Sequence, residues 1–154
     1  MNTGGAEMDG ESNKMIVERF DSILNTGDLG ELDELCSPDM VNHSLASSRP
    51  PGLAGSREWL TTEGPNFRSF IWQDLKVVAE NDLVVQFGTR GGDWPGGRFF
   101  GFDVPAGSYE RGTAFMYRLA DGRIVERWAV NDLLAMMLQL GAISVPSVTT
   151  RGGS

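Results

Sequence analysis

The spacing of apolar and polar residues changes its period once along this chain. In the first part, apolar residues recur every three to four positions, as on one face of a helix. The first stripe of this kind comprises Met15, Ile16, Phe20, Ile23 and Leu24. Ser12 can cap this helix, so we expect the helix to begin there. Shorter helices are predicted over 29–36 and over 56–63, where Gly64 and Pro65 end the pattern.

From Ile71 onward the period is two, which is typical of strands. Strands are predicted from 71 to the turn at 80–82, and over 83–90, 109–119 and 124–131, with a Gly-rich loop at "GGDWPGG". Asp121-Gly122 predicts a tight hairpin turn, because both residues tolerate left-handed backbone angles. A closing helix follows from Leu133, with Gly141 as its stop. Helices, then an antiparallel meander, then a helix predict an α+β fold.

The length and composition indicate one globular domain. The 154 residues suffice for one hydrophobic core, with 40% hydrophobic and 22% charged residues. We expect a domain over 12–143 and flexible tails at 1–11 and 144–154. A signal peptide and an apolar run of about 20 residues are both missing, which predicts a cytoplasmic protein. The net charge of −8 argues against nucleic acid and membranes as partners.

The residue counts argue against a metal site or a bound cofactor. The chain has one histidine, His43, and one cysteine, Cys36, so neither a disulfide nor a thiolate cluster can form. Cys36 continues the apolar spacing of Leu29, Leu32 and Leu35, which predicts a buried thiol. The "GGDWPGG" loop lacks the Lys and Ser/Thr of a phosphate loop. We therefore expect neither a metal nor a cofactor.

The hairpin turn fixes the expected pairing of the last two strands. Side chains that pair across a hairpin share one face of the sheet. The expected inner-face pairs are Leu119 with Ile124, Tyr117 with Glu126, Phe115 with Trp128, and Thr113 with Val130. The smaller and more charged face, with Arg118 and Arg127, is then the outer one. Glu126 is the one charge expected inside.

Asp132 follows this last strand and precedes the apolar closing helix. Two interpretations are open. As a helix cap, its carboxylate would accept backbone N–H bonds and stay ionised. As a reacting group, it would be desolvated by Phe115, Trp128 and the first turn of the helix, which raises the pKa of a carboxyl. Position alone favours the cap.

Three stretches resemble the SnoaL-like polyketide cyclases. They are "FGFDVPAGS" at 100–108, "FMYRLADGRIVERW" at 115–128, and "ND" followed by "QLG" at 139–141. "SPDMVNH" at 37–43 is similar to the family's segment before its third helix. The resemblance covers residues 14–141 and implies the cone-shaped α+β barrel shared with ketosteroid isomerase and nuclear transport factor two. In that fold, a bent antiparallel sheet and helices enclose a deep pocket.

The resemblance also implies roles for particular residues. Asp132 matches the family's general acid/base, and Asn42 matches a residue that holds the substrate. Phe115 stands where the cyclases keep a histidine that donates to the enolate oxygen, so His43 is a candidate replacement. We expect Phe115 and Trp128 to wall the pocket, because aromatic walls bind flat ligands well. Tyr117 and Glu126, on the same expected face, complete the predicted substrate-binding set.

We therefore predict a cofactor-independent cyclase of polyketide or antibiotic biosynthesis that closes a ring by acid/base chemistry. Its partner would be a small hydrophobic, polycyclic or polyketide-derived substrate, and the enzyme would be a homodimer or higher homo-oligomer. Epoxide opening is one alternative, which would need a second carboxylate or an arginine beside Asp132, and Glu126 could supply the carboxylate. A cofactor-free hydroxylase is another. The third alternative is a non-catalytic module that binds a ligand or dimerises through the outer face of the sheet.

Overall fold

The computed structural model describes residues 5–146, with side chains from Gly10 onward. Four α-helices and a 3-10 turn are formed by α1 (Gly5–Thr26), α2 (Leu32–Leu35), α3 (Leu53–Thr62), η1 (Gly64–Phe67) and α4 (Leu133–Gln139). The strands are β1 (Cys36–Asn42), β2 (Ile71–Glu80), β3 (Leu83–Trp94), β4 (Gly97–Phe99), β5 (Phe102–Val104), β6 (Gly107–Ala120) and β7 (Arg123–Asn131). This is the α+β fold predicted from the sequence.

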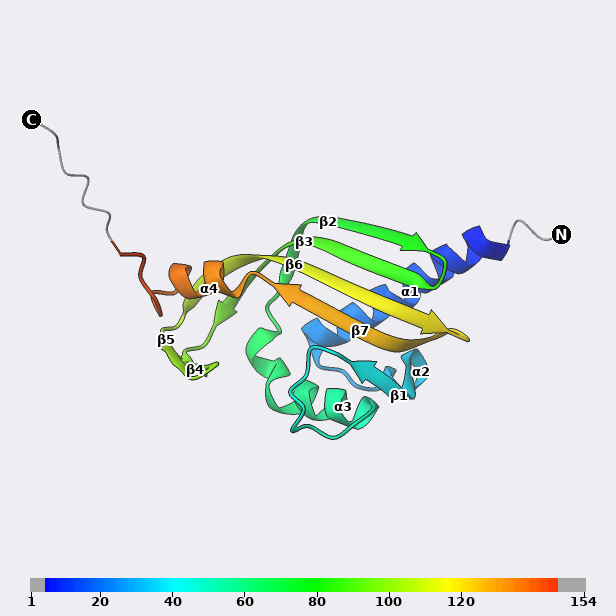
Figure 1. Ribbon diagram of the computed structural model, residues 1–154, viewed down its shortest axis with the longest axis horizontal. Helices are drawn as coiled ribbons and strands as arrows, with labels where there is room; N and C mark the ends of the chain where they lie inside the picture. Colours follow the sequence, from blue (N-terminus) through cyan, green and yellow to red (C-terminus); the bar gives the residue numbers. More distant parts are fainter. Residues whose placement is uncertain (1–4, 147–154) are drawn as a thin grey trace, which may run out of the picture.

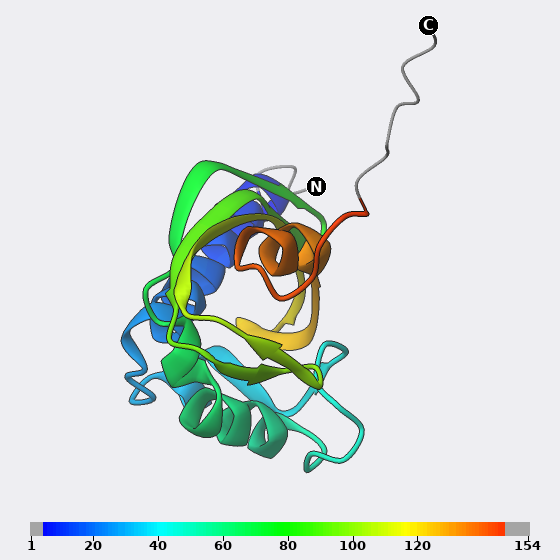
Figure 2. The same ribbon diagram turned by 90° about the vertical axis from the view of Figure 1, so that its left-hand side faces the viewer.

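Five strands form one curved sheet in the order β1-β7-β6-β3-β2. Figure 1 shows the sheet with α1 and α3 on one side of it, and Figure 2 shows how it curls around them. The pairs from β7 to β2 are antiparallel, as predicted, but β1 runs parallel to β7. The predicted antiparallel sheet is therefore confirmed, and β1 adds a parallel strand at its edge. No short turn joins these two strands, so nothing local fixes their direction.

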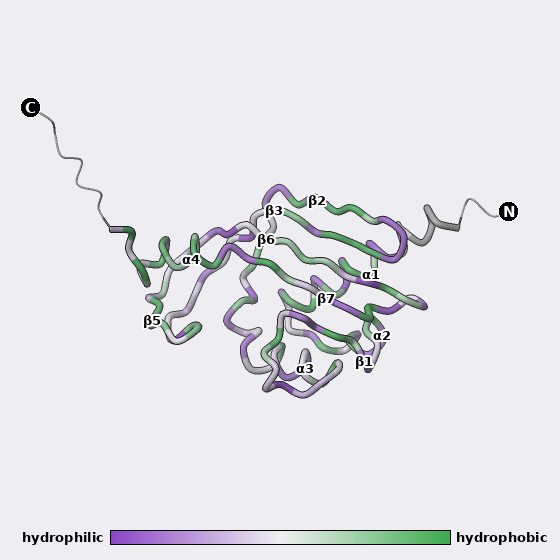
Figure 3. The backbone as a smooth tube through the Cα atoms, in the orientation of Figure 1, coloured by the Kyte–Doolittle hydropathy of each residue, from purple (hydrophilic) through white to green (hydrophobic). Residues whose placement is uncertain are grey.

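The period-two pattern of β6 faces the interior as predicted. Every second side chain from Tyr109 to Leu119 is buried, while the residues between them are partly or fully exposed. Asp121 and Gly122 form the predicted turn, with positive φ angles of 51° and 75°. Figure 3 shows that the turn between β2 and β3 is hydrophilic, whereas the strands on either side of it are largely apolar.

The β7 strand departs from the expected alternation because of a β-bulge at Val125. Leu119 pairs with Ile124 as predicted, but Arg118 then pairs with Glu126 and Tyr117 with Arg127. A bulge places two residues of one strand opposite one of the other, which shifts every later side chain to the other face. Beyond Val125, the predicted pairs and faces are wrong. Arg127, Ala129 and Asn131 point inward, whereas Glu126, Trp128 and Val130 belong to the outer face.

Several helix and loop boundaries also differ from the predictions. Helix α1 begins at Gly5, before the expected cap at Ser12. The predicted second helix is reduced to Leu32–Leu35, since Cys36 already starts β1. Strand β3 continues to Trp94, into the stretch predicted as loop. Trp94 is buried there and its indole N–H donates to the Val104 carbonyl over 3.1 Å.

Two groups of buried side chains form the core. One joins α1, α2, β1 and the hairpin, and includes Phe20, Leu35, Tyr117 and the predicted buried thiol, Cys36. The other joins η1, the end of β3 and α4, and includes Phe67, Phe70 and Met136. Within the described part of the chain, no helix is long and apolar enough to cross a membrane. The ends of the predicted tails, 1–4 and 147–154, lie outside the described residues.

Candidate functional site

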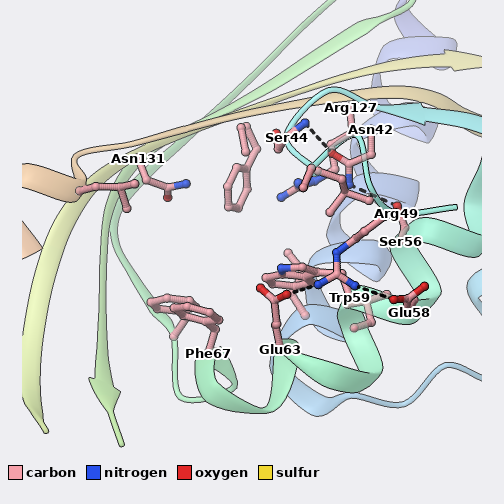
Figure 4. Close-up of a pocket in the computed structure, with 18 of the residues that line it drawn as sticks. Asn42, Ser44, Arg49, Ser56, Glu58, Trp59, Glu63, Phe67, Arg127 and Asn131 are labelled. Carbon is pink, nitrogen blue, oxygen red and sulfur yellow. Dashed lines mark hydrogen bonds and ion pairs between the residues drawn. The ribbon is translucent and has the colours of Figure 1, made fainter. Parts of the chain in front are cut away.

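A cavity of about 660 Å³ opens between the concave face of the sheet and helix α3. Its walls come from distant parts of the sequence: α1, the loop after β1, α3, η1, the β4 segment and the inner face of β3, β6 and β7. Figure 4 shows open space bounded by Phe67, Asn131, Glu63 and Trp59. The cavity is therefore large enough for a drug-sized ligand.

Three arginines project from neighbouring strands into the cavity wall. Arg90 on β3, Arg111 on β6 and Arg127 on β7 are all buried. Their guanidinium carbons lie over aromatic rings: Arg111 and Arg90 are each 5.0 Å from the centre of Phe70, and Arg127 is 4.5 Å from that of Phe115. Aromatic faces attract cations, so these rings partly stabilise the buried charges.

Arg90 has a carboxylate partner inside the protein. Its guanidinium donates to the Asp21 carboxylate over 2.9 Å and to the Asn25 side chain over 3.0 Å. Asp21 also accepts a 2.8 Å hydrogen bond from the Trp72 indole. Burial lowers the pKa of Arg90, and the Asp21 charge opposes this. Within this group, one carboxylate balances one arginine.

Arg111 and Arg127 have no carboxylate partner among the described side chains. Arg111 approaches the Met136 sulfur at 3.2 Å, and its Nε has no acceptor. Burial lowers the pKa of Arg111, and the charge of Arg90 lowers it further. Arg127 donates a long, 3.5 Å hydrogen bond to the Tyr117 hydroxyl. The cavity wall thus carries excess positive charge, although the whole chain has a net charge of −8.

The two carboxylates that line the cavity, those of Glu58 and Glu63, lie at its mouth. Arg49, in the loop after β1, forms ion pairs with Glu63 and with Glu58, the latter at 3.3 Å. Figure 4 shows Glu63 reaching past Trp59 toward the open space, with Glu58 on the other side of Arg49. Nearby, the Asn42 amide donates to the Ser56 hydroxyl over 3.2 Å and its oxygen accepts from the Ser44 N–H. These contacts fix the Asn42 carboxamide.

Of the predicted binding residues, Asn42 and Phe115 line the cavity. Tyr117 is on the predicted inner face but is completely buried beneath the wall. Glu126 and Trp128 were predicted inside and lie outside, because of the bulge at Val125. With Glu126 on the outer face, it does not supply the second carboxylate of the epoxide-opening alternative.

His43 joins this outer group. Its Nε2 lies 2.8 Å from the Glu126 carboxylate, and its ring stacks on Trp128 at 4.8 Å between centres. Glu126 also accepts from Arg118 over 3.1 Å. The hydrogen bond from His43, more than that from Arg118, lowers the pKa of Glu126. The structure therefore brings His43, Glu126 and Trp128 together, but on the surface opposite the cavity.

Asp132 caps helix α4. Its carboxylate accepts the Ala135 N–H over 3.0 Å, and the side chain is exposed. The neighbouring residues Asn131 and Leu133 line the cavity, whereas Asp132 does not. Of the two interpretations from the sequence, the structure shows the cap. The acid/base role of Asp132 stays a prediction.

The sequence patterns did not predict most of the polar residues that line the cavity. Arg111 occupies the same alternating face of β6 as Thr113 and Phe115, so extending that pattern by one step would have found it. Arg127 was placed outside because nothing local indicates the bulge. Arg49 and Glu63 come from a loop and a helix end whose proximity only the fold reveals. Among the described side chains, no three metal-ligating residues cluster.

A family model described as SnoaL-like polyketide cyclase matches residues 14–140. TsrD from Streptomyces laurentii has a similar structure, with a TM-score of 0.70 and 24% identity over 86% of this chain and 97% of that one. IdmH from Streptomyces antibioticus, a candidate polyketide cyclase, has a TM-score of 0.67 and 29% identity over 84% and 98% of the two chains. AclR from Streptomyces galilaeus, a candidate hydroxylase, is 20% identical over 86% and 97%, with a TM-score of 0.66. No curated protein matches the chain.

Proposed function

The chain belongs to the SnoaL-like polyketide cyclase family, and from this premise we propose that it closes a ring in a polyketide-derived substrate bound in the cavity. The proposed reaction is an intramolecular aldol-type closure that uses no cofactor. The observation that carries this proposal is the buried Arg127, which faces the cavity without a carboxylate partner among the described side chains. In many enzymes, a preorganised cation beside a developing negative charge accelerates the reaction strongly.

Arg127 would act on the enolate oxygen. The guanidinium stands over Phe115, in the position where the resemblance implies a histidine in the cyclases. Phe115 cannot donate a hydrogen bond, whereas Arg127 presents several N–H groups beside it. Arg127 is buried against aromatic rings, where the local dielectric constant is lower than in water, so its attraction to the enolate is stronger than it would be in solution. Arg127 would therefore replace the donor that Phe115 lacks.

Glu63 is the proposed proton acceptor. Its carboxylate would take a proton from a carbon between two carbonyls, which leaves an enolate held by Arg127. The enolate carbon then bonds to the carbon of a third carbonyl group of the same molecule, and the oxygen of that third carbonyl receives the proton back from Glu63. Atoms and charge balance, and the product is an isomer of the substrate. Asp132, the acceptor predicted from the resemblance, would have to leave its cap to do the same.

The test is ring closure of a tricyclic aromatic polyketide that carries a 1,3-dicarbonyl side chain and a separate ketone or aldehyde group as acceptor, followed by liquid chromatography and mass spectrometry. Arg127→Met is expected to lower kcat by about 10²–10³-fold, as for loss of an oxyanion donor. Glu63→Gln is expected to lower it by about 10²–10⁴-fold, as for loss of a general base. Arg123→Met, at the exposed end of the hairpin, is the matched control.

Wild-type turnover by Arg127→Met would contradict the enolate role, and wild-type turnover by Glu63→Gln would contradict the base assignment. The predicted homodimer and the predicted cytoplasmic location stay predictions. Light scattering of the purified chain tests the first.

A further inference from the structure

Arg111 faces a like charge across the sheet. In the pairing of β3 with β6, Arg90 and Arg111 stand directly opposite each other, and both side chains are buried. Like charges in opposed positions destabilise a sheet pair. Asp21 neutralises Arg90 over 2.9 Å, which leaves Arg111 as the uncompensated member of the pair.

The surroundings of Arg111 provide almost no hydrogen-bond acceptors. Among the described residues, its one polar contact is the Met136 sulfur at 3.2 Å, and neither its Nε nor the hydroxyl of neighbouring Tyr109 has a partner. A buried guanidinium is costly unless it is paired and hydrogen-bonded. The fold accepts this cost at a residue that lines the cavity. Such an arrangement is expected where a ligand supplies the missing anion.

A wall of stacked aromatic rings leads to this guanidinium. Trp59, Phe67 and Phe70 are nearly parallel, with ring centres 6.0 Å and 5.4 Å apart and interplanar angles of 11° and 12°. All three line the cavity, and the Arg111 guanidinium carbon lies 5.6 Å from the centre of Phe67 and 5.0 Å from that of Phe70. An apolar ligand packed against the cavity side of this stack would therefore present one end to Arg111.

We infer that the ligand of this cavity is a hydrophobic carboxylic acid, whose carboxylate Arg111 binds while its apolar body packs against the cavity side of Trp59, Phe67 and Phe70. This inference rests on the proposed function for the site itself and adds that the substrate is a free acid rather than a neutral ester. The guanidinium fork matches a carboxylate with two parallel N–H···O bonds. Arg111 thus anchors and orients the substrate, while Arg127 remains free for the enolate.

The test compares two probes of the same shape by titration calorimetry: 2-naphthoate and methyl 2-naphthoate. With the wild-type chain, the acid is expected to bind about 10–100-fold more tightly, the range of a hydrogen bond to a charged group. Arg111→Met should remove this preference and weaken only the acid. Arg111→Lys keeps the charge but loses the planar fork, and should keep part of the preference. Arg123→Met should keep all of it.

Thermal unfolding without ligand separates binding from a structural role. If Arg111 exists for the ligand, Arg111→Met should unfold at the same or a higher temperature, since it removes an unpaired buried charge. A clearly lower Tm would overturn the inference. Equal affinity for the two probes in the wild-type chain would also overturn it, as would a preference that survives in Arg111→Met.

Inorganic phosphate provides a further arm. The inference expects no displacement of naphthoate by an equal concentration of phosphate, because phosphate makes no use of the aromatic wall. Displacement would mean a general anion site and would overturn the assignment. These measurements need no turnover. A preference for the acid without ring closure would therefore contradict the proposed function alone.

Discussion

Two clusters of charged and aromatic side chains lie on opposite sides of the curved sheet, and their ion pairs have almost the same length. On the inner side, Arg90 and Asp21 are 2.9 Å apart, and their side chains are 2% and 11% exposed. On the outer side, Arg118 and Asp82 are 2.8 Å apart, with 39% and 49% exposed. Distance alone would rank these two pairs as equals.

Burial distinguishes them. Water screens the outer pair and solvates either partner when the other is removed, so such pairs contribute little. The inner pair has lost its water, so each charge depends on the other. Burial would likewise strengthen the attraction of a ligand to Arg111 and Arg127, which have no carboxylate partner among the described side chains. The outer residues His43, Glu126 and Arg118 instead bond to one another. We therefore expect the buried arginines of the inner cluster, rather than the outer cluster, to act on a bound ligand.

Removing one carboxylate from each side tests directly whether burial makes the inner pair the stronger one. Asp21→Asn leaves Arg90 buried without a counter-charge and is expected to cost about 3–5 kcal/mol in the free energy of unfolding. Asp82→Asn, the matched control, should leave that free energy nearly unchanged. Urea denaturation followed by tryptophan fluorescence measures both. Equal losses in the two variants would show that burial does not separate the clusters.

How far the sequence predicts this molecule depends on the range of the interaction concerned. The β6 face and the Asp121-Gly122 turn were predictable, because period-two burial and the backbone preference of Asp-Gly act over a few residues. The direction of β1 was not, since its partner β7 lies about 90 residues away and no turn connects them. Long-range pairing is set by the packing of the whole sheet.

The site was less predictable than the fold. Asn42 and Phe115 were found, Asn42 through the resemblance and Phe115 also through its strand face, and both line the cavity. Glu126 and Trp128 were placed on the wrong face of the sheet. A single extra residue, Val125, forms a bulge, and a bulge moves every later side chain of the strand to the opposite face. Arg49 and Glu63 meet only because the loop after β1 folds back over α3. A sequence pattern does not contain that contact.

The second prediction concerns Asp132, at the end of β7 where the inner and outer faces meet. Asp132→Ala removes the acceptor of the Ala135 N–H and is expected to cost about 1 kcal/mol, measured by urea denaturation. Asp132→Asn keeps a capping side chain and should be nearly neutral. Because asparagine cannot act as a base, kcat separates the two roles. Unchanged turnover in Asp132→Asn leaves the site on the inner face, and abolished turnover would restore Asp132 as the proton acceptor.

The third and smallest effect concerns the outer cluster. The hydrogen bond from His43 lowers the pKa of Glu126, so the ionised carboxylate stabilises the fold. For a lowered carboxyl pKa, this stabilisation is present above the ordinary carboxyl range, about pH 4–5, and is lost as the pH falls through the pKa of the folded state. The difference in Tm between wild type and Glu126→Gln should therefore be small at neutral pH and vanish in acid.

His43→Ala should remove most of the same difference, since the two residues form one pair, and a double-mutant cycle measures their coupling. Neither variant is expected to change kcat for ring closure or the affinity for naphthoate, because neither side chain lines the cavity. A fall in turnover for His43→Ala alone would mean that the outer surface takes part in the reaction. The inner and outer clusters would then be two halves of a single site, because the bulge at Val125 places its residues on both faces of the sheet.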